Sequence, residues 1–544
     1  MSWNAWYLDD GNVVTTLEGA KLTLDLILRE GPRYGLFLNL SKTTIAGHKL
    51  SPKALHSLGI PEQLLRSEPC AEACPTAVVL GTPIGPEPFL QLQLAPTLGK
   101  LSRFCRAVLH LRDPQVALML LRQSLGICRV THILRTVDTT LIFTALEALD
   151  DMYLNVLRSL ISDELTPDSW EQAGLPTRHG GLGLTHCLSV APLAYVASVL
   201  TFSDKCLDLK LPQAARLPSA ALRNVCNLLS PTLCPAVVVL LQAVSNTQMP
   251  LQHCNPEATS QKWWSSFVHS KCSRELLSRA SARDRVRLQS LSAPLSGSWL
   301  TALPSSQLGL SFSPQEFQAL MKWRLGLPII PIGQHQCPFC GEVMDNFGDH
   351  STCCAKSNLT ARHTCVVNAI ARVLKSVALD VTPEVAILGR QRPADLLIKG
   401  LSWPEPDALD VTVVNPMSDF DNPQAAERVD KAEENKHKKY DDICGKAKVK
   451  MNAFGMSVLG GVGPEASRFL GLVREKLLQQ HGDAEGKTLA NEAVQRIPVA
   501  CQRAVAGQLL KSMGGLWVEP SARPFEGAPS EGGEERKGED PELC

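Results

Sequence analysis

The chain has 544 residues, 44% of them hydrophobic, and its 54 Lys and Arg residues balance its 54 Asp and Glu residues. The length predicts three or four domains, the hydrophobic content excludes disorder throughout, and the balanced charge confines any surface for nucleic acid to a local patch. Eighteen cysteines and an N-terminus unlike a signal peptide predict an intracellular protein. The longest apolar run, Pro235–Leu241, is too short to span a membrane.

A pair of acidic residues, Asp9 and Asp10, lies near the start of the chain. Strand-forming stretches at 3–6 and 12–16 flank the pair, so we expect a β-hairpin with both carboxylates at its turn. Adjacent carboxylates repel each other unless a divalent cation neutralises them, which makes the pair a candidate metal site. An ordinary acidic turn is the alternative, because aspartate is common in turns.

Two further segments, Gly35–Thr43 and Val79–Gly85, follow the hairpin. In this order the three segments resemble the catalytic loop and the next two motifs of a reverse transcriptase palm of the kind found in non-LTR retrotransposons. The resemblance implies that Asp9 and Asp10 bind magnesium at a polymerase centre and that Lys42 lies near the incoming nucleotide. A reverse transcriptase needs another metal-binding aspartate on an earlier strand and fingers that hold the template. We therefore expect a palm remnant, the rear part of a longer polyprotein, without polymerase activity of its own.

A helical region is predicted from about Leu98 to Val244, because apolar residues recur there at spacings of three and four. Within it the glycine-rich stretch Leu175–Leu184 lies between two apolar helices and resembles a block that follows the thumb in the same retroelement proteins. A flexible joint, at which two backbones approach closely, is the alternative for this stretch.

A basic helix is expected after Trp263 and Trp264, extending to Leu288. Basic side chains beside aromatic rings suit nucleic acid, because the charges bind phosphates and the rings stack on unpaired bases. A solvated helix face is the alternative. The candidate nucleic-acid-binding residues are Arg274, Arg279, Arg283 and Arg287.

Potential zinc ligands occur further along with the spacing Cys-x2-Cys-x9-His-x3-Cys. They are Cys337, Cys340, His350 and Cys354. Three thiolates and one imidazole suit a closed tetrahedral site, so the expected metal is a structural Zn²⁺. Cys353 and His363 are alternatives for the fourth ligand, and Cys353 has to point away if Cys354 binds. Ordinary buried cysteines without a metal are the other interpretation.

Two acidic residues lie on apolar segments beyond the zinc ligands. Asp395 begins a short apolar segment, and a turn over 399–407 leads to a second one, Leu409–Val414, which contains Asp410. Antiparallel pairing of the two segments brings the acids to neighbouring positions. Burying two carboxylates together is costly unless they share a divalent ion. Glu384 is a third acidic candidate on a preceding segment.

A further helix is expected after these strands, with Asn422 as its cap and Pro423 at its first position. Its apolar stripe contains a lysine, Lys436, although a lysine is rarely buried. The position makes sense if Lys436 reaches the phosphate or the attacking water near the aspartates. Lys439, on the flank of the stripe, is the other candidate.

The zinc-ligand spacing, the two aspartates and the run Lys436–Tyr440 together resemble the restriction-enzyme-like endonuclease of early-branching, target-primed non-LTR retrotransposons. The resemblance implies that Asp395 and Asp410 hold Mg²⁺, or Mn²⁺, for hydrolysis of a DNA phosphodiester, and that the nick primes reverse transcription. DNA and RNA are the implied partners. The usual restriction-enzyme pattern has a lysine two residues after the second acid, where this chain has Thr412, so the helix supplies the lysine instead.

Three alternatives to an active endonuclease stay open. In the first, the two aspartates lie at ordinary strand edges and the lysines on an ordinary surface helix. In the second, the protein is a catalytically dead relic that only binds nucleic acid. In the third, the chain is a fragment of a full reverse transcriptase split by gene modelling. The leading prediction is an intracellular, nuclear α+β multidomain protein. Its predicted regions are a palm remnant (1–95), a helical thumb-like region (96–260), a basic helical linker (261–330), a zinc knuckle (331–366), a restriction-like endonuclease domain (367–516) and a disordered tail (517–544).

Overall fold

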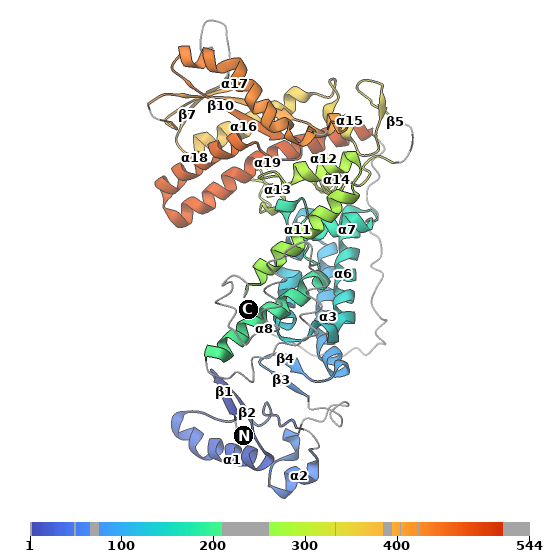
Figure 1. The fold of residues 1–544 in the computed structure, drawn as a ribbon, viewed down its shortest axis with the longest axis vertical. Coiled ribbons are helices and arrows are strands. Elements are labelled where there is room, and N and C mark those ends of the chain that lie inside the picture. The colour runs from blue at the N-terminus through green and yellow to red at the C-terminus, as the bar shows by residue number, and fades with distance from the viewer. Residues whose placement is uncertain are drawn as a thin grey trace.

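The computed structural model describes residues 3–47, 50–65, 76–208, 260–331, 333, 335–383, 394–402, 404–422 and 424–514. Helices predominate and the sheets are small, so the predicted mixed α+β class is confirmed. The molecule is elongated, with a small N-terminal part, a column of helices and a broad C-terminal part (Figure 1). The candidate Glu384, Pro423, and the predicted tail lie outside the described residues.

The N-terminal part begins with the predicted hairpin, which is confirmed. Strands β1 (Trp3–Tyr7) and β2 (Asp10–Val14) pair in antiparallel register, with Tyr7 opposite Asp10. The hairpin leads into α1 (Leu17–Glu30), whose residues are all at least partly exposed. A small separate core is formed by Leu55, Ile60 and Leu64. The other elements of this part are α2 (Pro52–Ser57), β3 (Ala77–Val79) and β4 (Thr82–Ile84).

A column of helices follows. Its elements are α3 (Glu87–Leu109), α4 (Pro114–Leu120), α5 (Thr131–Thr136), α6 (Phe143–Ile161), α7 (Pro167–Gly174), α8 (Cys187–Asp208) and α11 (Gln261–Arg279). The first helix begins at Glu87 and not near Leu98. A proline is tolerated in its first turn, because the backbone amides of a first turn have no hydrogen-bond partner within the helix. The predicted glycine-rich connection between α7 and α8 is confirmed.

The basic stretch forms two helices and not one. Helix α11 begins at Gln261, so both tryptophans lie within it and do not precede it. The chain leaves the helix after Arg279, and α12 (Ala282–Leu291) begins anew after Ser281, whose side chain accepts a hydrogen bond from the Asp284 amide. A serine cap of this kind satisfies an amide that has no partner in the helix, which explains the new start.

The C-terminal part packs around helix α19. Its helices are α12 (Ala282–Leu291), α13 (Ser298–Thr301), α14 (Pro314–Leu325), α15 (Asp349–Cys353), α16 (Leu359–Ser376), α17 (Arg428–Lys446), α18 (Pro464–His481) and α19 (Asp483–Met513). Helix α14 has the full set of end signals, with a Ser313–Glu316 capping box, Pro314 in its first turn and Gly326 in the left-handed region at its end. One hydrophobic core runs without interruption from Phe89 in the column to Met513 in α19.

A mixed four-stranded sheet lies in this part. Its strands are β7 (Asp380–Pro383), β8 (Leu396–Lys399), β9 (Asp407–Val414) and β10 (Lys450–Ser457), in the order β10-β9-β8-β7. The predicted antiparallel pairing of β8 with β9 is confirmed, whereas β10 is parallel to β9. A short hairpin of β5 (His335–Gln336) and β6 (Val343–Met344) precedes this sheet along the chain.

The two faces of the sheet belong to two hydrophobic clusters. Leu396 and Leu409 join the large core beside α16 and α18, whereas Ala408 and Met451 pack with Cys444 of α17. Because side chains alternate along a strand, Asp410 lies on the same face as Ala408, which is the face that α17 covers. The connection from β9 through α17 to the parallel strand β10 therefore places a helix directly over the acids.

Helix α17 begins later than expected. Its first residue is Arg428, preceded by a short 3-10 turn at Ala425–Glu427. The Asn422 side chain still accepts a hydrogen bond, from the Gln424 amide at 3.0 Å, so it closes a local turn ahead of the 3-10 turn and does not cap the helix. Among the helices in the described ranges, none combines the length and the apolar character that crossing a bilayer requires.

Candidate functional site

The four predicted zinc ligands come together. The Sγ and ring nitrogen atoms of Cys337, Cys340, His350 and Cys354 all lie within 4.8 Å of one another. The Sγ atoms of Cys337 and Cys354 are 3.9 Å apart, and Cys340 Sγ is 3.2 Å from His350 Nε2. A tetrahedral Zn²⁺ with Zn–S bonds of about 2.3 Å places its sulfur ligands about 3.8 Å apart. The donor set and its spacing therefore fit a zinc ion, and this group can bind a metal of that kind.

Local backbone geometry holds these ligands in place. Gly341 and Gly348 adopt positive φ angles of 83° and 81°, which glycine takes without strain, and they let the loop fold back. The Asp345 carboxylate accepts hydrogen bonds from three amides, among them that of His350 at 2.7 Å. Burial opposes ionisation of Cys337, but nearby amides and the polar side chains of Cys340 and His350 lower its pKa to about 7, which favours a metal-binding thiolate.

The two alternatives for the fourth ligand lie elsewhere. The Cys353 thiol donates to the His350 carbonyl at 3.5 Å and is not part of the ligand group. The His363 ring lies 3.3 Å from the Asp395 carboxylate. Cys354 is therefore the fourth member of the group, and Cys353 points away, as its neighbour's position requires.

The structure places Asp395 and Asp410 side by side. Leu396 pairs with Leu409 across β8 and β9, and the Asp395 amide donates to the Leu409 carbonyl at 3.0 Å. Asp395 directly precedes Leu396 and Asp410 directly follows Leu409, so in this antiparallel register the two acids are neighbours on adjacent strands. Oδ2 of Asp395 also accepts from the Val411 amide at 2.7 Å, which fixes the carboxylate against β9. The predicted neighbouring positions are confirmed.

Of the two candidate lysines, Lys436 contacts the acids. Its Nζ atom forms an ion pair with Oδ2 of Asp410 from α17, across the face of the sheet. Lys439 is exposed, and its Nζ atom lies 4.8 Å from the centre of the Tyr440 ring. The predicted position of Lys436 within the inward stripe of the helix is therefore confirmed.

A residue that sequence reasoning assigned only as an alternative zinc ligand joins this site. His363 of α16 lies 3.3 Å from Asp395 and 3.1 Å from the Val411 carbonyl, in each case through Nε2. The contact between the half-buried Asp395 and a histidine 32 residues earlier leaves no local pattern in the sequence. Its position among apolar residues at the start of an amphipathic helix was the available signal.

Burial and nearby charges have opposing effects on the pKa values of Asp395, Asp410 and His363. Burial favours the neutral form of Asp395, but the hydrogen bonds from His363 and Val411 and the charge of Lys436 lower its pKa below the ordinary value. Burial and the neighbouring Asp395 charge raise the pKa of Asp410, and Lys436 offsets part of this effect. Hydrogen bonding to Asp395 raises the pKa of His363 although burial lowers it. Two close carboxylates in one buried site therefore depend on nearby positive charge.

The remaining candidates near the N-terminus are exposed. Asp9 lies at the hairpin turn, Asp10 begins β2, and Lys42 lies in a separate loop. Within the described ranges, the single group of three or more potential metal-ligating side chains is the Cys/His group, and it includes neither Asp9 and Asp10 nor Asp395 and Asp410.

Two of the four candidate nucleic-acid-binding arginines are buried, which corrects the expectation that they share a surface. Arg283 forms an ion pair with Asp349, and Arg287 with Asp284, and their side chains are 10% and 5% exposed. Arg279 is more exposed but contacts both Asp168 and Glu171. Arg274 is exposed. Desolvated guanidinium groups that already have acidic partners are unavailable to phosphates, because burial requires such pairing.

No protein-family model matches the chain, and no curated protein matches it.

Proposed function

We propose that this protein is a metal-dependent DNA endonuclease whose centre is formed by Asp395, Asp410 and Lys436. The observation that carries the proposal is the ion pair between Lys436 and Asp410, formed on the face of the sheet where Asp395 is the adjacent acid. Two neighbouring carboxylates can bind a divalent cation and a lysine beside them can contact a phosphate, which are tasks that hydrolysis of a phosphodiester can use. The resemblance to retrotransposon endonucleases points to the same two aspartates and leaves the lysine open between Lys436 and Lys439; the ion pair with Asp410 favours Lys436.

Each side chain has a distinct task in the proposed reaction. The two carboxylates provide oxygen ligands for Mg²⁺ or Mn²⁺, both of which prefer oxygen. When bound, such a cation supplies Lewis acidity that activates water and offsets phosphate charge. Lys436 leaves Asp410 for the phosphate and stabilises the negative charge that develops there. His363 holds Asp395 in position through Oδ2.

The Cys/His group has an architectural task in this proposal. Its four ligands close the coordination sphere of Zn²⁺, so no position is open for a substrate. The zinc is therefore structural, and the chemistry belongs to the acidic centre.

The N-terminal hairpin contributes no polymerase activity in this proposal. It resembles a palm remnant, and in the described ranges its two aspartates are not part of a larger group of potential metal ligands. DNA and RNA are the proposed partners, and the nucleus is the proposed location. A catalytically dead relic that only binds nucleic acid is the competing interpretation, and the experiment below separates the two.

Nicking of supercoiled plasmid in Mg²⁺ or Mn²⁺ tests the proposal. Asp395→Asn and Asp410→Asn keep the side-chain size and an acceptor oxygen but remove the charge. We expect each to lower the nicking rate on the order of a hundredfold or more. Asp421→Asn, in an exposed turn after β9, is the matched control. Equal nicking by wild type and both variants places the centre elsewhere, and a wild-type protein that nicks in neither metal supports the relic.

A further inference from the structure

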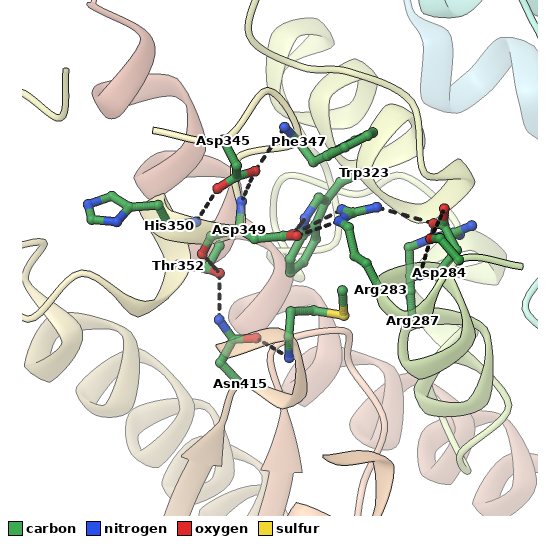
Figure 2. Close-up of polar contacts among 12 residues, drawn as sticks. Arg283, Asp284, Arg287, Trp323, Asp345, Phe347, Asp349, His350, Thr352 and Asn415 are labelled. Carbon is green, nitrogen blue, oxygen red and sulfur yellow. Dashed lines mark hydrogen bonds and ion pairs between the residues drawn. The ribbon is translucent and has the colours of Figure 1, made fainter. Parts of the chain in front are cut away.

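Helix α15, which bears the metal ligand His350, is buried among three other segments. Its first residue, Asp349, forms a bidentate ion pair with Arg283 of α12, with Nε–Oδ2 and Nη2–Oδ1 distances of 2.5 and 3.0 Å. The Trp323 indole of α14 donates to the same carboxylate at 3.1 Å. Arg283 also lies 3.9 Å above the Phe347 ring. Figure 2 shows these side chains gathered around Asp349 at the start of α15, next to His350.

A second set of bonds leads from α15 to strand β9. The Asn415 side chain is buried and donates through Nδ2 to the Thr352 hydroxyl at 2.9 Å (Figure 2). Thr352 in turn donates to the Asp349 carbonyl at 2.9 Å. Oδ1 of Asn415 accepts a hydrogen bond from the Met417 amide at 2.9 Å, so Asn415 caps the start of the 3-10 turn η10 (Pro416–Asp419). Since Asn415 directly follows β9, the two hydrogen bonds of its side chain fix the end of the strand that contains Asp410.

A third set of bonds leads from α15 to the other acid. Arg362 in the first turns of α16 is buried and donates through Nη1 to the Thr352 carbonyl at 2.7 Å and to the Gln508 side chain of α19 at 2.9 Å. The next residue, His363, contacts Asp395. The same threonine of α15 therefore joins one path to Asp410 and another to Asp395.

We propose that the metal-bearing helix α15 sets the relative position of the two acids, with Thr352, Asn415 and Arg362 as positioning residues. Metal binding orders α15 because His350 lies in it and Cys354 follows it directly. Ordering α15 fixes the Thr352 hydroxyl and carbonyl, which hold the end of β9 and the start of α16. The catalytic consequence rests on the proposed endonuclease function, whereas the coupling between the metal site and β9 does not.

Hydrogen exchange of the full chain tests the coupling without any activity measurement. We compare the zinc-loaded protein with protein depleted of zinc by a chelator, following peptides that cover β9. We expect removal of zinc to accelerate exchange in β9 about tenfold or more, because local opening then costs less. Peptides that cover the distant β3–β4 hairpin are expected to stay unchanged, and they report whether depletion has unfolded the whole chain.

A variant that keeps the metal separates coupling from loss of folding. Asn415→Ala removes the bond to Thr352 but touches no metal ligand, so we expect one zinc per chain, faster exchange in β9 and a nicking rate lowered about tenfold. Asn422→Ala, in an exposed turn nearby, is expected to match the wild type in all three measurements. Unchanged β9 exchange in both zinc-depleted and Asn415→Ala protein overturns the proposal. Accelerated exchange in a wild-type protein that never nicks supports the coupling and refutes only the endonuclease function.

Discussion

The Nζ atom of Lys436 forms an ion pair with Oδ2 of Asp410. The two residues are 26 positions apart and come from a helix and a strand, so the contact exists only because α17 crosses over the sheet between β9 and β10. Lys439, one turn further along the same helix, is directed to the Tyr440 ring instead. Of these two lysines, only Lys436 lies on the side of α17 that faces the sheet, and this position brings it to Asp410.

The two lysines are predicted to differ in their effect on nicking. Lys436→Gln removes the charge that stabilises the developing phosphate charge, so we expect a loss on the order of a hundredfold in the nicking rate. Lys439→Gln is the matched control, since it removes an equal charge at an exposed position of the same helix. The measurement is plasmid nicking at equal protein concentration with DNA binding assayed in parallel. Equal losses in the two variants contradict the assignment.

One zinc ion per chain is predicted, and neighbouring cysteines allow a sharp test. Cys354→Ser removes a ligand, whereas Cys353→Ser alters a thiol that only donates to a backbone carbonyl. We expect Cys354→Ser to lose the metal and to melt at a lower temperature, because the binding energy of a structural zinc is also folding energy. Cys353→Ser is expected to keep both. Elemental analysis and thermal unfolding are the measurements, and a full zinc content in Cys354→Ser refutes the ligand set.

The buried ion pair of Arg283 is predicted to matter for stability and not for nucleic-acid affinity. Arg283→Gln leaves the Asp349 carboxylate buried without its partner, which costs about 3–5 kcal/mol in free energy of unfolding. Arg279→Gln removes a more exposed arginine that also has acidic partners, and we expect a cost of about 1 kcal/mol or less. Urea unfolding and a DNA-binding titration measure the two properties. A variant that is as stable as wild type but binds DNA weakly reverses the interpretation of Arg283.

Local patterns predicted much of this arrangement, whereas long-range partners were not predictable. The N-terminal hairpin, the grouping of the zinc ligands and the neighbouring positions of Asp395 and Asp410 all follow from residues within a short stretch of chain. The partners of Arg283 and His363 lie 66 and 32 residues away, and no local pattern in the sequence identifies either partner. A basic run looks the same in sequence whether its arginines face water or meet acids of another helix.

The start of α17 was mispredicted for a related reason. Asn422 has the chemistry of a helix cap, but it closes a local turn ahead of the helix. What holds the helix in place is Glu433, a buried acid whose carboxylate accepts hydrogen bonds from the amides of Gly455, Glu465 and Ala466. These partners belong to β10 and α18, so the helix is fixed by tertiary contacts that no local signal of its own sequence reports.

The stability contributed by His437 is predicted to fall as the pH rises. Its two ring nitrogens each lie 2.7 Å from a carboxylate, Nδ1 from Asp441 and Nε2 from Glu465. The Glu465 carboxylate also accepts a hydrogen bond from the Ala453 amide in β10, an edge strand of the sheet. Burial opposes the charged form of His437, but the two carboxylates outweigh it and raise the pKa above the ordinary value. The charged ring thereby joins α17 to α18 beside the sheet.

A pKa that is higher in the folded than in the unfolded protein fixes the sign of the effect. The stabilisation is fully present below the unfolded pKa of about 6.5 and disappears as the pH rises through the folded pKa. The melting temperature of wild type should therefore exceed that of His437→Gln most clearly at about pH 5–6.5, at and below the unfolded pKa of the histidine. The difference should shrink towards pH 9. His481→Gln, at the exposed end of α18, controls for the loss of a histidine. A difference that is constant or grows with pH shows that His437 is uncharged between its two acids.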